Sequence, residues 1–185
     1  MLKYVVGLFA CLALTGCSKV ASPDLSAPQA AKPSTPANPD QALYDQVRSG
    51  TYQISTSIDS IEEVRKTARE IASRETGDTR QALLAIAKKL DEAGAALSDF
   101  GDEPPSFEEF KKNFAAQDDR RLKAIDAANK ALDDLGDAQD VLEKLLDSHP
   151  PEPENTQLGS ADTALDGCNQ AVEDAIKAMG GKVSD

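Results

Sequence analysis

The chain has 185 residues, and its 20 lysine and arginine residues face 32 aspartate and glutamate residues, which gives a net charge of −12 at pH 7. Such an acidic chain repels phosphates, which argues against a nucleic-acid-binding role. Its single histidine and three cysteines leave few of the ligands and bases that zinc, haem and nucleophilic sites use.

The first sixteen residues have the layout of a secretory signal peptide. A short positive region with Lys3 precedes an apolar run from Val5 to Leu14, and the small residues Thr15 and Gly16 follow. The run is about ten residues long, which is well short of the roughly 20 that span a bilayer as a helix. We therefore expect residues 1–16 to be a signal peptide that is removed.

The four residues Leu14, Thr15, Gly16 and Cys17 resemble the lipobox of bacterial lipoproteins. The resemblance implies that diacylglycerol is attached to the Cys17 sulfur and that cleavage just before Cys17 starts the mature chain there. A thiol suits this step because it is nucleophilic enough near neutral pH to take the lipid. An ordinary signal peptide with a chance cysteine is the alternative.

Lipid on Cys17 would hold the protein to a membrane, because each buried methylene adds about 0.8 kcal/mol. In enteric bacteria an aspartate after the lipidated cysteine tends to retain a lipoprotein in the inner membrane, and here that residue is Ser18. The resemblance therefore implies a lipid-anchored protein of the bacterial outer membrane that faces the periplasm.

Residues 17–39 predict a disordered tether behind the lipidated cysteine. The stretch from Ser18 to Asn38 is rich in alanine, proline and serine, with few large apolar side chains to offset the entropy of ordering. Such a segment lets the following domain stand clear of the bilayer. A proline-rich ligand for a partner's groove is the alternative interpretation.

Residues 40–181 predict a helical domain whose first helix runs to about Glu75. Asn38 and Pro39 are typical of a helix start, and apolar residues then recur at threes and fours. These positions are Leu43, Val47, Ile54, Ile58, Ile61, Val64, Ala68 and Ile71. Gly50, beside serine and threonine, could break this helix into two.

A second helix is predicted from the cap around Thr76 to Asp78 up to Gly101, where a glycine ends it. One side of it is apolar and consists of Leu83, Ile86, Ala87, Leu90, Ala93, Leu97 and Phe100. This helix has the clearest amphipathic pattern in the chain.

Ser106 and Glu109 predict a capping box that opens a third helix, which reaches about Ser148. A continuous helix would be about 63 Å long, so we expect it to break near Asp118 or to project. Its apolar positions are Phe107, Phe110, Phe114, Leu122, Ile125, Ala128, Leu132, Leu135, Leu142 and Leu145. We expect the three phenylalanines in the core, and an exposed docking stripe is the alternative.

A fourth helix is predicted from Ser160, as its cap, to the glycines at 180 and 181, with residues 182–185 as a disordered tail. Its apolar face consists of Ala161, Ala164, Leu165, Cys168, Ala171, Val172, Ala175, Ile176 and Met179. We expect Cys168 to be a buried, inert thiol, and the alternative is an exposed thiol that pairs with another chain.

Four amphipathic helices with short connections and no convincing strand predict an all-α fold, an antiparallel helical bundle of about four helices. Cys11 would leave with the signal peptide and Cys17 would carry lipid, so only Cys168 remains in the domain. The mature chain would therefore form no internal disulfide.

The sequence contains no pattern typical of an enzyme. The one histidine, His149, lies beside Pro150 in a predicted linker, where it is poorly placed to act as a base. Two carboxylates alone could cleave a glycosidic bond, but the chain has no tryptophan and only three tyrosines to stack on sugars. We expect a protein that is not an enzyme and that uses no cofactor or metal.

The densest acidic cluster consists of Asp133, Asp134, Asp137 and Asp140. Three of these, at positions 133, 137 and 140, fall on the helix side opposite the leucine stripe. A helix surface holds carboxylates too far apart to wrap calcium, so we expect a solvated acidic face.

These features together predict a membrane-anchored envelope lipoprotein that acts as a noncatalytic protein-interaction or assembly module, with another envelope protein as its partner. The alternative is a helical lipoprotein that binds a small apolar or cationic compound between its helices. A cavity lined by the phenylalanines and rimmed by acids would favour this alternative.

Overall fold

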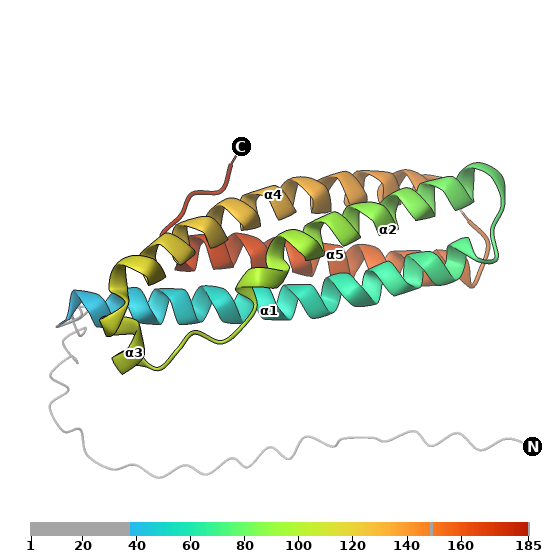
Figure 1. Ribbon diagram of the computed structural model, residues 1–185. Helices are drawn as coiled ribbons and strands as arrows, with labels where there is room; N and C mark the ends of the chain where they lie inside the picture. Colours follow the sequence, from blue (N-terminus) through green and yellow to red (C-terminus); the bar gives the residue numbers. More distant parts are fainter. Residues whose placement is uncertain (1–37, 149, 185) are drawn as a thin grey trace, which may run out of the picture. The chain divides into compact units, whose positions relative to one another are not determined.

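The computed structural model describes residues 38–148 and 150–184, which form an antiparallel bundle (Figure 1). The described elements are α1 (Pro39–Ala72), α2 (Gly77–Leu97), the 3₁₀-helix η1 (Ser98–Phe100), α3 (Phe107–Lys112), α4 (Phe114–Asp147) and α5 (Glu154–Ala178). All of them are helical, and this part of the chain contains no strand, which confirms the predicted fold class. The signal peptide, the lipobox from Leu14 to Cys17 and the tether up to residue 37 lie outside the described residues.

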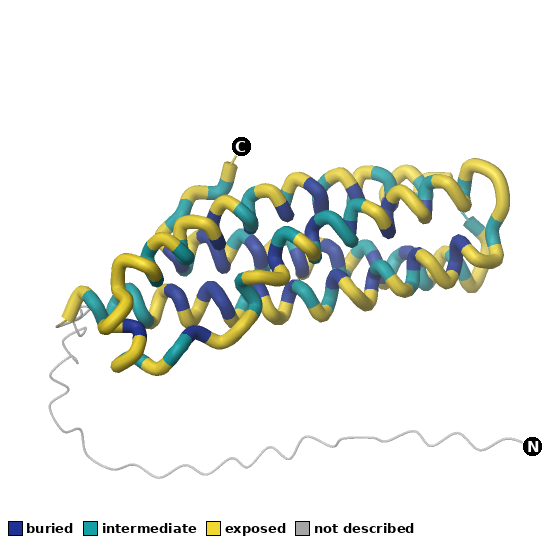
Figure 2. The backbone as a smooth tube through the Cα atoms, viewed as in Figure 1, coloured by how far each residue is buried: buried dark blue, intermediate teal, exposed yellow. Residues whose placement is uncertain are grey.

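Each of the four long helices packs against two neighbours. α1 contacts α2 and α5, and α4 contacts the same two helices from the other side. Figure 2 shows that buried positions follow the inward side of each helix. The central cluster is aliphatic apart from Cys168 and Met179, and each leucine or isoleucine buried there contributes about 1.5–3 kcal/mol relative to an exposed one. Leu122 does not join this core and is exposed.

None of the helices within the described ranges combines the length and the apolar character that crossing a membrane requires.

α1 begins as predicted and then runs without a break past Gly50. Asn38 caps it, because its Oδ1 atom accepts a hydrogen bond of 3.0 Å from the Asp40 amide. Gly50 is buried under Met179, and a Cβ added to Gly50 would lie 2.3 Å from the Met179 Cγ. The glycine therefore serves close packing and does not break the helix.

The third predicted helix breaks earlier than expected. Asn113, with φ −122° and ψ 32°, ends α3 and begins α4, so the expected break near Asp118 is wrong. Asp118 lies inside α4, where it accepts a hydrogen bond from Arg121. The early break directs α3 toward α1, where the ring of Phe110 lies 5.3 Å from that of Tyr44.

The prediction that the phenylalanines belong to the core is confirmed for Phe110, which is fully buried. Phe107 is half-buried, and its ring lies tilted against that of Tyr44 with 5.4 Å between the ring centroids. Phe114 is 37% exposed at the start of α4. Ser106 stands at the N-cap of α3 as predicted, but its side chain caps no backbone N–H group, so the predicted capping box does not form. The Ser106 hydroxyl instead donates a hydrogen bond of 3.1 Å to the Glu109 carboxylate.

α5 begins at Glu154 and not at Ser160, so the predicted start was wrong. Ser160 lies inside the helix, where its hydroxyl donates to the Thr156 carbonyl. The first turns are held by Leu158, whose buried side chain extends the apolar face beyond Ala161 toward the N-terminus. The preceding prolines and Gly159 had favoured a loop there, but tertiary packing outweighs this local preference.

Residues 182–184 are ordered against α4, so the expected disordered tail is wrong for these residues. The Asn129 side chain donates to the Lys182 carbonyl at 3.2 Å and accepts from the Ser184 amide at 2.9 Å. Val183 packs on the edge of the core between these two contacts. A single polar side chain therefore fixes a segment whose composition predicts disorder.

Candidate functional site

The regular bundle is interrupted where α2 and η1 end beside the middle of α1. Residues 101–106, which we call the strap, continue from there in non-helical conformation toward α3 (Figure 1). The strap touches α1 at Gly101, where an added Cβ would lie 2.9 Å from the Ile58 Cδ1 and 3.7 Å from the Ser55 Cα. A side chain at this position would have to displace the tip of Ile58.

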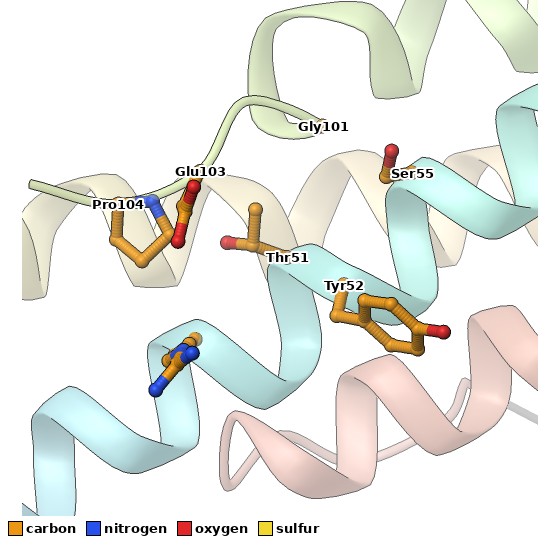
Figure 3. A pocket seen from close by; sticks show the side chains of 7 residues that line it. Thr51, Tyr52, Ser55, Gly101, Glu103 and Pro104 are labelled. Atoms are coloured by element: carbon orange, nitrogen blue, oxygen red, sulfur yellow. The ribbon is translucent and has the colours of Figure 1, made fainter.

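A cleft of about 350 Å³ lies between α1 and the strap (Figure 3). We call it the strap cleft, and its lining consists of Arg48, Thr51, Tyr52, Ser55, Gly101, Glu103 and Pro104. Its volume falls at the lower end of the range for small-ligand pockets. Its walls come from α1 and from the strap, two segments that lie about fifty residues apart in the sequence, because a helical hairpin separates them.

The strap cleft carries polar groups that no described residue satisfies. Neither the Arg48 guanidinium nor the Glu103 carboxylate forms a hydrogen bond or an ion pair with a described side chain. Tyr52, one helical turn after Arg48, is 71% exposed. Tyrosine and arginine are the residue types that most often dominate the energy of protein interfaces.

Sequence reasoning did not identify these residues, although a local signal was present. Arg48 and Tyr52 fall outside the apolar stripe of α1 and share one polar face of the helix. An aromatic ring on a polar helix face indicates a candidate contact surface. That this ring lines a cleft depends on the position of the strap, which only the tertiary structure gives.

A second cleft, of about 260 Å³, lies at the end of the bundle where the α1–α2 and α4–α5 connections meet. We call it the end cleft, and it is lined by Ile71, Glu75, Thr79, Leu145, Ser148, Pro150, Pro151, Glu154 and Leu158. Ile71 and Leu158 are buried and supply an apolar floor. Glu75 and Glu154 are half-buried, and neither has a hydrogen-bond or ion-pair partner among the described residues.

The phenylalanines line neither the strap cleft nor the end cleft. They gather around Tyr44 near the start of α1 and fill the space there. The phenylalanine-lined pocket considered for the ligand-binding alternative is therefore not formed in either cleft.

The acidic cluster on α4 is only partly a solvated face. Asp133 and Asp140 are exposed as predicted, but Asp134 is only 8% exposed and faces α2. Lys89 on α2 bridges this site, with its Nζ atom 2.8 Å from Asp137 and 3.1 Å from Asp134. The hydrogen bonds that Lys89 donates to these two aspartates, Asp137 first, raise the pKa of Lys89. The three aspartates predicted to form the solvated face, at positions 133, 137 and 140, are all exposed, and Asp134 lies on the side of α4 that faces Lys89.

A second ion-pair group joins α1 to α2. Asp91 accepts hydrogen bonds from Arg65 at 2.8 Å and from Arg69. The hydrogen bond to Asp91 raises the pKa of Arg65. Both groups tie helices together. No set of histidine, cysteine, aspartate or glutamate residues in ranges 38–148 and 150–184 is arranged to hold a metal ion.

Cys168 is buried in the middle of α5, as the sequence predicted. Burial raises the pKa of its thiol to about 11, which keeps it protonated and unreactive near neutral pH. The predicted lipidation site at Cys17, with Leu14, Thr15 and Gly16, lies outside the described residues.

The clefts and ion pairs described above form no arrangement typical of a known catalytic site, so the site chemistry by itself identifies no family. We found no match to the chain among protein-family models, curated proteins or solved structures.

Proposed function

We propose that this protein is an envelope lipoprotein, anchored through Cys17 to the outer membrane on its periplasmic side, that acts as a noncatalytic protein-interaction module. The anchor part of the proposal rests on the resemblance of Leu14 to Cys17 to a lipobox. The interaction part rests on one observation, the exposed Tyr52 beside Arg48 at the strap cleft.

The chemistry of the strap cleft favours a protein segment as its occupant. Tyr52 offers a large ring that loses little conformational freedom on contact, because only two torsions need to be fixed. Arg48 adds up to five hydrogen-bond donors and a positive charge to a surface that is otherwise acidic. A partner segment with an apolar side chain for Tyr52 and a carboxylate for Arg48 complements this surface.

A crosslinked pull-down from detergent-solubilised envelopes tests the proposal. We expect the native protein to bring down one reproducible partner, identified by mass spectrometry, and Tyr52→Ala to reduce its yield about tenfold. Leu84→Ala is the matched control, because Leu84 is 46% exposed on α2 and does not line the strap cleft.

A Cys17→Ser version tests the anchor in the same experiment. Loss of the partner together with loss of membrane association would support an assembly role that depends on membrane placement. A partner retained at full yield by Tyr52→Ala, or no specific partner for the native protein, would contradict the interaction module.

A second candidate function is the binding of a small compound. The observation that favours it is the end cleft, which combines a buried apolar floor with two carboxylates that have no described partner. A cleft that offers apolar surface beside a few polar groups suits a small ligand, since the apolar surface supplies affinity and the polar groups fix orientation.

A further inference from the structure

We infer that the end cleft binds a primary ammonium compound with a small apolar body. This inference rests on the ligand-binding candidate function and is independent of the interaction module at Tyr52.

The charged residues that line the end cleft, among those that the structure describes, are both acidic. They are Glu75 and Glu154, and no described lysine or arginine lines the cleft. Arg74 neighbours Glu75 in the sequence, but its guanidinium donates to the Gln157 side chain at 3.1 Å. The two carboxylates therefore face the cleft without a cation from the described chain.

Both carboxylates lie at positions that favour negative side chains. Glu154 is in the first turn of α5, and Glu75 stands just before Thr76, the N-cap of α2. The N-terminal end of a helix carries a partial positive charge, which stabilises a nearby carboxylate. These residues thus supply a stable pair of anionic acceptors at one end of the bundle.

The remaining lining residues indicate which kind of cation fits. Thr79 and Ser148 also line the cleft, and the Ser148 hydroxyl, which donates to the Leu145 carbonyl at 2.6 Å, keeps its oxygen as an acceptor. A primary ammonium group has three N–H donors to distribute among such acceptors. Quaternary ammonium groups are bound mainly by aromatic cages, and none of the described residues that line the end cleft is aromatic. The acceptor set therefore favours a primary over a quaternary ammonium.

The end cleft offers an apolar surface against which the apolar part of the ligand can pack. Ile71 and Leu158 form the buried floor, and Leu145, Pro150 and Pro151 supply further apolar walls. The cleft of about 260 Å³ has the volume of about nine water molecules, so it suits a compound of the size of an arylalkylamine. Burial of apolar ligand surface against these walls adds to the affinity.

Isothermal titration calorimetry on the full mature chain in detergent tests the inference with three probes of similar shape. These are 2-phenylethylammonium, the neutral 2-phenylethanol and the anionic phenylacetate. We expect the ammonium to bind about tenfold more tightly than the alcohol, because charge-assisted hydrogen bonds are stronger than neutral ones, and phenylacetate to give no binding heat.

Paired variants assign the binding to the two carboxylates. A Glu75→Gln/Glu154→Gln protein keeps the shape of the cleft, and we expect it to lose about tenfold in affinity for the ammonium while its affinity for the alcohol is unchanged. The matched control is Glu63→Gln/Glu70→Gln, which removes two exposed charges from α1 outside the end cleft. Circular dichroism checks that each variant is folded.

The outcomes separate the inference from the function on which it rests. Equal binding of alcohol and ammonium, or unchanged ammonium binding by the Glu75→Gln/Glu154→Gln protein, overturns the cation inference and leaves the ligand-binding candidate standing. No binding of any probe overturns both. Preference for the ammonium that is lost only in the end-cleft variant supports the inference.

Discussion

Met179 lies directly over Gly50, so close that a Cβ on Gly50 would come within 2.3 Å of the methionine Cγ. The contact joins the C-terminal end of α5 to the first half of α1, and the Ala175 carbonyl lies 3.2 Å from the same position. Because a backbone carbonyl stands behind the methionine, a larger residue at Gly50 cannot be accommodated by a side-chain movement alone.

Gly50→Ala should therefore destabilise the bundle, although alanine is the better helix former. Overpacking costs typically about 1–3 kcal/mol, and the gain in helix propensity returns about 1 kcal/mol, which leaves a net loss of about 1 kcal/mol. Urea denaturation followed by circular dichroism measures it. Gly136→Ala on α4 is the control, since its Cβ would meet no neighbour and should stabilise the protein. Equal effects of the two substitutions would contradict the packing role of Gly50.

The burial of Phe110 should make it the most sensitive of the three phenylalanines. Phe110→Ala removes a fully buried ring and is expected to cost about 3–5 kcal/mol in the free energy of unfolding. Phe114→Ala removes a ring that is 37% exposed and should cost clearly less. The urea denaturation midpoints of the two variants measure this difference. Equal losses of unfolding free energy would show that the aromatic cluster is not organised around Phe110.

The bridge from Lys89 to α4 should matter more than a surface ion pair. Lys89→Met leaves the buried Asp134 without its partner, whereas Lys88→Met removes only an exposed pair with Glu92. We expect the first substitution to lower the urea midpoint and the second to leave it nearly unchanged. Adding Asp134→Leu to Lys89→Met should recover stability, and a failure to recover would show that Asp134 is not the cause of the loss.

Cys168 should give the protein a dependence of stability on alkaline pH. The thiol of an unfolded chain ionises near pH 9, while burial holds the folded pKa at about 11. The folded state therefore retains a proton that the unfolded state has lost, so the free energy of unfolding falls as pH rises from 9 to 11. Below pH 9 the contribution of this thiol to stability is fully present.

Urea denaturation of the wild type and of Cys168→Ala at pH 8, 9 and 10 measures this effect. The wild-type curve should fall more steeply above pH 9, because only the wild type has the thiol. The other groups that titrate in this range are common to both proteins and cancel in the comparison. Parallel curves would mean that the thiol ionises equally in the folded and unfolded states.

The sequence by itself determined where helices exist and which sides of them are apolar. The buried residues of α2, from Leu83 to Leu97, are those that the three-and-four spacing selects, because this periodicity is a local property of the backbone. The start of α1 at Asn38 and Pro39 followed for the same reason, since capping involves only neighbouring residues. The lipobox resemblance at Cys17 stays a prediction.

Only the tertiary structure decided where the helices end and which residues come together. The break at Asn113 depends on the burial of Phe110 against Tyr44, and the early start of α5 depends on the burial of Leu158. The position of residues 182–184 depends on hydrogen bonds to Asn129. Asn129 lies more than fifty residues earlier in the sequence, on another helix of the bundle.

The two clefts are also features that only the tertiary structure decided, since each is lined by segments that are distant in the sequence. Tyr52 shares a cleft with the strap only because η1 ends beside α1, and Glu75 shares a cleft with Glu154 only because two connections meet at one end of the bundle. The periodicity within one helix contains no information on which distant segments line the same cleft. They follow from the free energy of packing whole helices, which sums over contacts that no short stretch of sequence contains.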